Sequence, residues 1–199
     1  AYIGYILHLV IVYSLSIKFL AGMSPIKFFK GMAAAMLTAF TTTSSNATLP
    51  VNIECCNKMG AEPEISSFVL PLGATMHMDG SCFSCVLKIA FLFGVFGIPF
   101  EGAGLIVKIL LVAVFSSVAM SGIPGGGGTG ELVVCTIFFP DHLAIAYPIA
   151  LAIGNLVDPP ATMINSAGDY VVSYIVSRFV EGKDWLQKKL AKDGEKKIE

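Results

Sequence analysis

Three aspartates in otherwise apolar sequence are the residues best suited to do chemistry. Asp79 directly precedes Gly80, and Asp158 and Asp169 stand in the run NLVDPPATMINSAGDY (155–170). A charged carboxylate at the centre of a bilayer costs at least about 2.5 kcal/mol, so such residues usually have a function. Glycine and proline beside them favour helix breaks that free backbone carbonyls. A carboxylate beside free carbonyls predicts an oxygen-rich site for Na⁺ or another hard cation.

The run 155–170 also places four polar residues on one helical face. Asp158, Thr162, Asn165 and Asp169 follow one another at spacings of four, three and four, which are the spacings of neighbours on a helix. This stripe suits a ligand with an ammonium and a carboxylate: Asp158 pairs with the ammonium, and Asn165 donates its amide to the carboxylate. Asp169 is then left for the cation. Alternatively, the threonine and asparagine join neighbouring helices by hydrogen bonds.

The elements that must hold these residues are apolar segments of two lengths. A helix needs about 20 apolar residues to cross about 30 Å of hydrocarbon. Three segments are long enough: Ala1–Leu20, Phe68–Ile98 and Leu143–Val180. Two pairs of arms are shorter: Phe28–Thr41 with Leu49–Met59 around TTTSSNAT, and Leu105–Met120 with Leu132–Phe139 around SGIPGGGGTG.

Each pair of short arms predicts a re-entrant helical hairpin with an irregular tip. Non-helical backbone at membrane depth persists only where protein or a water-filled cavity surrounds it, so we expect both tips to face one polar cavity. Lys18, Lys27, Lys30 and Lys58 flank the first span and first hairpin, and the positive-inside rule places them in the cytoplasm. The second hairpin then enters from the opposite side, as in an inverted repeat. Interfacial helices or kinked spans are the alternative.

Composition indicates an integral membrane protein. The chain has 199 residues, 55% hydrophobic and 14% charged, with a mean hydropathy of +0.75, whereas a soluble domain carries about 25% charged residues. No basic stripe precedes the charged tail, which argues against nucleic-acid binding, and the five cysteines show no secretory disulfide framework. The chain begins inside an apolar run without an initiator Met, so we expect a C-terminal piece of a longer protein.

Four motifs resemble the dicarboxylate/amino acid:cation symporter family, which comprises sodium-coupled glutamate and aspartate transporters and their neutral amino acid relatives. They are SSNATLP (44–50), MDGS (78–81), GIPGGG (122–127) and the series from Asp158 through TMIN to Asp169, in family order. The resemblance implies an all-α membrane protein with three transmembrane helices, two of them broken, and two opposed re-entrant hairpins in an elevator transport domain. Its expected bounds are a transport domain over 1–180 (helix 1–20, hairpin one 25–60, broken helix 66–98, hairpin two 103–140, broken helix 142–180) and a charged cytoplasmic tail over 181–199.

The same resemblance implies which residues bind. Substrate is held between the hairpin tips, with hairpin two as the gate, by Ser45, Ser81, Asp158, Thr162, Asn165 and Gly125. One cation site is implied at Asp169 with backbone oxygens of Gly73, His77 and Asn165. A second is implied at backbone oxygens of Thr75, Ser117, Val118 and Met120, and Asp79 belongs to a third.

Two departures from the family pattern bear on substrate and ion. Family members that carry acidic substrates place an arginine at one of two positions that are Thr43 and Ala161 here, and the only arginine in the chain is Arg178. A substrate side-chain carboxylate would lack its bidentate partner, which predicts a neutral amino acid. His77 replaces the usual asparagine; imidazole nitrogen is a poor Na⁺ ligand, so His77 is either a proton-coupling group or a hydrogen-bonded structural histidine.

The resulting expectation is a symporter and not an enzyme. Na⁺ entry, with H⁺ as the alternative ion, drives uptake of a neutral amino acid by an elevator mechanism without an organic cofactor. The expected partners are an amino acid or dicarboxylate substrate, membrane lipid and, in the full-length form, two further copies in a homotrimer built on an upstream scaffold. The expected location is a cell membrane crossed several times, the inner membrane of a bacterium.

The sequence is also compatible with three other functions. One is an acidic amino acid or C4-dicarboxylate symporter of the same family, coupled to Na⁺ or to protons. Another is an ion channel, because hairpins that meet at the midplane also build pores. The third is a membrane metal or redox protein that uses His77, Asp79, Cys82 and Cys85. Glu131, just past the second tip, has no assigned role.

Overall fold

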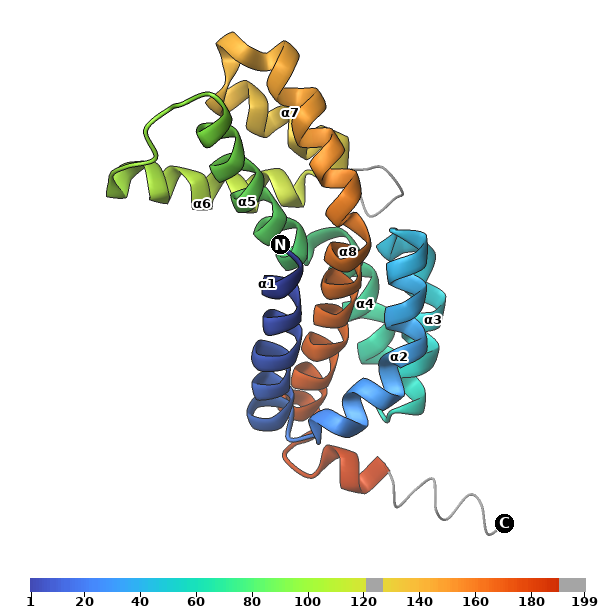
Figure 1. The fold of residues 1–199 in the computed structure, drawn as a ribbon. Helices are drawn as coiled ribbons and strands as arrows, with labels where there is room; N and C mark the ends of the chain where they lie inside the picture. The colour runs from blue at the N-terminus through green and yellow to red at the C-terminus, as the bar shows by residue number, and fades with distance from the viewer. Residues whose placement is uncertain (121–126, 190–199) are drawn as a thin grey trace.

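The computed structural model describes residues 1–120 and 127–189, and within these ranges every regular element is a helix. Figure 1 shows an elongated molecule with α8 running along most of its length. The elements are α1 (Tyr2–Leu7), η1 (His8–Tyr13), η2 (Ser16–Ala21), α2 (Pro25–Thr42), α3 (Ser45–Lys58), α4 (Pro63–Met76), α5 (Asp79–Val95), α6 (Ala103–Val118), α7 (Gly127–Phe138), η3 (Pro140–His142) and α8 (Leu143–Glu181).

Within the described residues, three helical stretches are long and apolar enough to cross a membrane, which agrees with the expected number of spans. They are Tyr2–Ala21, Pro63–Val95 and Pro140–Glu181. Two other apolar helices are shorter: α6 has 16 residues and α7 has 12. At 1.5 Å per residue they measure about 24 and 18 Å, less than the roughly 30 Å of a hydrocarbon core.

The second span is interrupted at His77 and Met78. Helix α4 ends at Met76, and His77 is extended, with φ −88° and ψ 91°. Helix α5 then begins at Asp79, so this carboxylate stands in the first turn of a helix. The partial positive charge of a helix N-terminus favours an acid there, which gives Asp79 a local reason for its place in an apolar segment.

The expected break in the third span is wrong. Helix α8 is continuous over 39 residues, and Pro159 and Pro160 lie inside it. Proline φ fits a helix, but the residue lacks an N–H donor and its ring crowds the carbonyl four residues earlier, which bends the helix. The carbonyl that Pro160 leaves without its helical donor belongs to Leu156, and the Tyr2 hydroxyl donates to that oxygen at 2.7 Å. The helix therefore bends instead of ending (Figure 1).

Helices α2 and α3 pack against each other and are joined by Thr43 and Ser44. Thr43 has a positive φ of 50°, and the Ser44 Oγ caps α3 by accepting the Ala47 N–H at 3.1 Å. Most of the polar run TTTSSNAT is therefore helical, and the turn is shorter than its composition suggests. Helices α6 and α7 also pack together.

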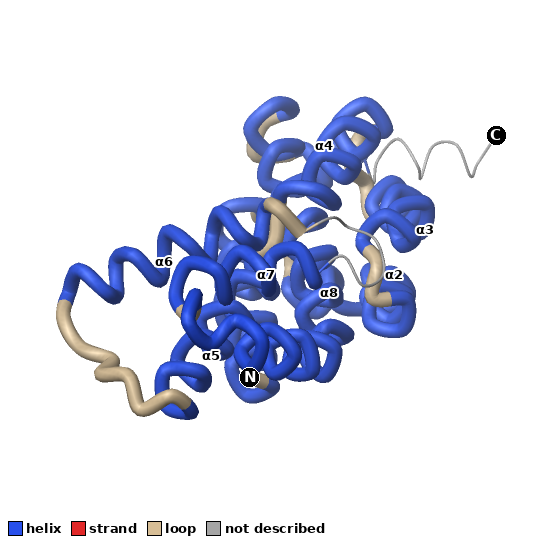
Figure 2. Tube along the Cα trace, turned by 90° about the horizontal axis from the view of Figure 1, so that it is seen from above, coloured by secondary structure: helices blue, strands red, loops and turns tan. Residues whose placement is uncertain are grey.

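Two hydrophobic cores lie on either side of the middle of α8. One core joins the first span, α2 and α3 to the second half of α8, where Ala161 and Ala167 are buried. The other joins α5, α6 and α7 to the first half of α8, at Ala146 and Ala150. Figure 2 shows α8 between the α5–α7 group and the α2–α4 group. The polar run 155–170 begins between the two cores, and its apolar residues from Val157 onward belong to the first of them.

Candidate functional site

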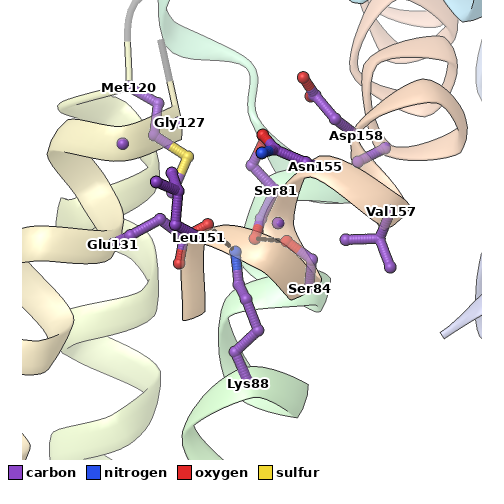
Figure 3. A pocket seen from close by; sticks show the side chains of 13 residues that line it. Ser81, Ser84, Lys88, Met120, Gly127, Glu131, Leu151, Asn155, Val157 and Asp158 are labelled. Atoms are coloured by element: carbon purple, nitrogen blue, oxygen red, sulfur yellow. Dashed lines mark hydrogen bonds and ion pairs between the residues drawn. The ribbon is translucent and has the colours of Figure 1, made fainter. Parts of the chain in front are cut away.

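A polar pocket lies where α5, α7 and α8 meet, between the two cores. Its polar lining side chains are Ser81, Ser84, Lys88, Glu131, Asn155 and Asp158 (Figure 3). The pocket volume is about 30 Å³, which is room for about two water molecules. An amino acid is larger, so a substrate can enter only if some of the lining residues move.

The polar stripe of α8 contacts the start of α5 beside this pocket. Thr162 Oγ1 donates to Asp158 Oδ1 at 3.1 Å, and Asn165 Nδ2 donates to Ser81 Oγ at 3.0 Å. The Gly80 N–H donates to Asn165 Oδ1 at 2.8 Å. The structure thus brings together Ser81, Asp158, Thr162 and Asn165, four of the six residues expected to hold substrate. These bonds form two pairs, one with the Asp158 carboxylate and one with the Asn165 amide, and one member of each pair lines the pocket.

Asp169 lies one turn further along α8, next to the break in the second span. Its side chain is 1% exposed, and neither carboxylate oxygen has a hydrogen-bond donor among the residues that the structure describes. His77 Nδ1 lies 3.5 Å from Asp169 Oδ1 and 3.3 Å from the Asn165 carbonyl oxygen. Gly73 packs so closely that a Cβ there would lie 2.7 Å from Asp169 Cγ.

This second arrangement fits a hard cation. A buried carboxylate without a hydrogen-bond donor is costly, and a bound cation would reduce that cost. Gly73 and the His77 ring lie close to Asp169, and the Asn165 carbonyl lies close to His77, while cation binding by these four residues stays a prediction. Asn165 contacts both groups, because its side chain bonds α5 at the pocket while its carbonyl faces His77.

Asp79 is held differently, by residues of the first span that sequence reasoning missed. Asp79 Oδ2 lies 2.8 Å from His8 Nε2 and also accepts the Tyr13 hydroxyl. Asp79 Oδ1 accepts the Gly80 N–H at 2.9 Å. His8 and Tyr13 were visible as polar side chains in an apolar span, but nothing in their spacing indicated that they face Asp79.

Sequence reasoning also missed Lys88, which forms an ion pair with Glu131 at the pocket. Lys88 is 3% exposed and Glu131 is 2% exposed. Figure 3 shows the Lys88 amino group reaching from α5 to the Glu131 carboxylate on α7. The signal was present, because a lysine inside the apolar run Phe68–Ile98 costs about as much as an aspartate there. The structure gives Glu131 the partner that the sequence did not supply.

Comparison with known proteins decides the family. The profile of the "Sodium:dicarboxylate symporter family" matches residues 1–179. The chain belongs to this family. It is therefore a member of a sodium-coupled transporter family, not of an enzyme family, and with three candidate spans it is part of a multi-pass membrane protein.

The similar proteins include both neutral and excitatory amino acid transporters. The Caenorhabditis elegans protein named "Putative sodium-dependent excitatory amino acid transporter glt-4" is 35% identical over 94% of this chain and 36% of its own length. Human neutral amino acid transporter A is 34% identical over 98% of this chain and 35% of its own length. Mouse neutral amino acid transporter B(0) is 34% identical over 90% of this chain and 32% of its own length. The chain thus spans about a third of the length of these symporter relatives.

The other residues that the family resemblance implies for substrate and cation binding do not form one cluster in the described part of the chain. Ser45 is buried at the first position of α3 and does not line the pocket. Thr75 Oγ1 donates to the Leu72 carbonyl at 2.9 Å. Ser117 is buried and Val118 is 44% exposed at the end of α6, and Met120, two residues further on, lines the pocket. Gly125 lies outside the described residues. Roles for this set stay predictions.

A metal or redox centre finds no support in the side-chain geometry. Across residues 1–120 and 127–189, no group of three or more His, Cys, Asp and Glu side chains is placed to hold a metal ion. The five cysteines are free thiols. A Na⁺ site made of one carboxylate and backbone carbonyls is of a different kind and does not need such a group.

Proposed function

We propose that the complete protein is a Na⁺-coupled symporter of a neutral amino acid and that residues 1–180 form its transport domain. The observation that carries the proposal is the adjacency of two unlike sites on α8. One is a pocket lined by Asp158 and Ser81, with the Asn165 amide bonded to Ser81 beside it, and the other is the buried Asp169 with no donor on its carboxylate in the described residues. Family membership supports sodium as the coupled ion.

The proposed binding mode follows from the charges in the pocket. Asp158, oriented by the Thr162 hydroxyl, pairs with the ammonium of the substrate. Asn165 Nδ2 and the Ser81 hydroxyl, now bonded to each other at 3.0 Å, turn to the substrate carboxylate as donors. Na⁺, carried as a second substrate, binds at Asp169 and the nearby carbonyls.

Asn165 supplies the proposed coupling between the two substrates. Its side chain bonds to the pocket residue Ser81, and its carbonyl approaches the His77 ring next to Asp169. An ion that fixes the Asn165 backbone thereby orients the amide that receives the substrate carboxylate. Thermodynamic linkage then requires that bound amino acid strengthen Na⁺ binding by the same factor.

We further propose that α2–α3 and α6–α7 are re-entrant hairpins of opposite orientation and that the second is the gate. The short length of α6 and α7 supports this, since neither reaches across a bilayer. The small pocket supports the gate, because α7 carries part of its lining. In an elevator mechanism this domain would slide along a scaffold, and the scaffold and the trimer contacts would belong to the part of the protein outside this chain.

Two positions support a neutral substrate. Thr43 is at the turn between α2 and α3, and Ala161 lines the pocket, so neither expected position carries a guanidinium. Arg178 donates to the Phe19 carbonyl at 2.8 Å, near the other end of α8. A side-chain carboxylate without a cationic partner loses several kcal/mol on burial.

The test is uptake by the complete protein in liposomes. An inward Na⁺ gradient should drive saturable uptake of radiolabelled serine or alanine, and a proton gradient alone should not. Asp158→Asn should lower amino acid affinity at least about tenfold, the equivalent of about 1.4 kcal/mol, while Na⁺ still raises the melting temperature of the variant. Undiminished serine uptake by Asp158→Asn would remove this residue from the pocket.

An acidic amino acid or dicarboxylate substrate is the second candidate. Lys88 lines the pocket and supplies a cation that the sequence analysis did not anticipate, and the name of one relative refers to excitatory amino acids. In the liposome assay this candidate predicts aspartate uptake and little serine uptake. A bacterial inner membrane as the location stays a prediction.

A further inference from the structure

Lys88 and Glu131 form an ion pair, and both residues line the pocket. Both side chains are almost fully buried, at 3% and 2% exposure. One Glu131 oxygen, Oε1, accepts from Lys88 Nζ. The other oxygen, Oε2, is buried and has no donor among the residues that the structure describes. The pair is thus neutral as a whole, but it presents an unsatisfied acceptor.

Gly154 makes room for this pair on α8. A Cβ at position 154 would lie 3.7 Å from Lys88 Nζ and would overlap the Glu131 carboxylate. The pair therefore packs directly against the α8 backbone, one turn before Asp158. The three pocket-lining helices meet at these two charges.

The position of the pair within the pocket indicates which part of a substrate it faces. In the proposed binding mode the ammonium is held at Asp158 and the carboxylate at Asn165 and Ser81. Figure 3 shows Glu131 and Lys88 on the side of the pocket opposite Asp158. The substrate side chain is the group left to approach them.

Resting on the proposed function, we propose that Glu131 determines specificity by neutralising Lys88 and so excludes substrates with a side-chain carboxylate. Lys88 alone would attract such a carboxylate. Paired with Glu131, it has no net charge to offer, and the free Oε2 repels a second carboxylate while it accepts a hydrogen bond from a hydroxyl or amide. Loss of the Glu131 charge should convert the pocket to one that accepts acidic amino acids.

The experiment measures uptake of radiolabelled serine and aspartate by the complete protein in liposomes under a Na⁺ gradient. The wild type should take up serine and discriminate against aspartate. Glu131→Gln, which keeps the side-chain shape, should raise aspartate uptake relative to serine uptake at least about tenfold. The double variant Lys88→Met/Glu131→Gln removes both charges and should not gain aspartate uptake.

A matched control lies on the surface of α3. Glu54 and Lys58 form an exposed ion pair at 2.5 Å, four residues apart. Glu54→Gln makes the same chemical change outside the pocket and should leave the ratio of aspartate to serine uptake unaltered. Gain of aspartate uptake in this control, or in the double variant, would overturn the assignment to Lys88.

The outcomes separate the two proposals. A wild type that takes up neither amino acid, or only aspartate, contradicts the proposed function. Serine uptake by the wild type with an unchanged ratio in folded Glu131→Gln contradicts only the role of Glu131. A further case is failure of Glu131→Gln to fold under conditions in which Lys88→Met/Glu131→Gln folds. In that case an excess of aspartate during purification should restore folded Glu131→Gln, because aspartate would neutralise Lys88. Failure of aspartate to restore it would overturn the proposal.

Discussion

The three aspartates in the apolar segments differ in how many hydrogen-bond donors the protein gives them. Asp79 has the His8 ring, the Tyr13 hydroxyl and the Gly80 N–H. Asp158 has the Thr162 hydroxyl and lies at the pocket. Asp169, the most buried of them, has no donor within the described part of the chain. At the residue scale, Asp169 is the acid that most needs a cation from outside.

This imbalance predicts the effect of Asp169→Asn on ion coupling. The substitution removes the charge that favours Na⁺, so the Na⁺ concentration for half-maximal serine uptake should rise at least about tenfold, the equivalent of about 1.4 kcal/mol. The measurement is serine uptake by the complete protein in liposomes at graded external Na⁺.

Asp184→Asn is the control, because Asp184 is an exposed acid in the loop after α8. It should leave the Na⁺ dependence as in the wild type. An unchanged Na⁺ dependence in Asp169→Asn would mean that Na⁺ binds elsewhere.

At the scale of elements, α8 shows how a helix survives two consecutive prolines. Two backbone donors are missing, and the chain remains helical because the proline φ is compatible with a helix. The Tyr2 hydroxyl from the first span replaces one donor at Leu156. A hydrogen bond between two spans therefore replaces one that proline removes within the helix.

A double-mutant cycle tests this replacement. Tyr2→Phe should lower the free energy of unfolding by about 0.5–1.5 kcal/mol in the wild-type background. In a Pro160→Ala background the restored backbone N–H at position 160 can donate to the Leu156 carbonyl, so Tyr2→Phe should have little effect there. The measurement is denaturant-induced unfolding of the complete protein in detergent. Equal losses in both backgrounds would show that the two groups are not coupled.

At the scale of the whole molecule, the pocket exists because two cores meet on one helix. The described chain also leaves large apolar side chains uncovered, among them Ile3 at 76%, Phe115 at 72% and Phe179 at 80% exposure. Lipid or a further part of the protein must cover these surfaces, since large exposed apolar patches are unstable in water. The length of the relatives, about three times that of this segment, supports a further protein part.

This view predicts different behaviour for the segment and the complete protein. Residues 1–199 expressed alone should sediment with membranes, because three of their helical stretches can span a bilayer. They should not support Na⁺-driven serine uptake in liposomes, because the proposed elevator has no scaffold to move against. Transport by the isolated segment at a rate similar to that of the complete protein would contradict the elevator proposal.

The sequence alone determined the helical class, the number of spans and the family, because apolar length and local motifs carry that information along the chain. It also located Asp158, Thr162 and Asn165 correctly on one face, since helical spacing is a local property. Only the tertiary structure paired Lys88 with Glu131, brought His8 to Asp79 and brought the Tyr2 hydroxyl to the Leu156 carbonyl. These contacts join residues from 43 to 154 positions apart. No local pattern encodes which distant donor reaches a buried charge or a freed carbonyl, so packing decides it.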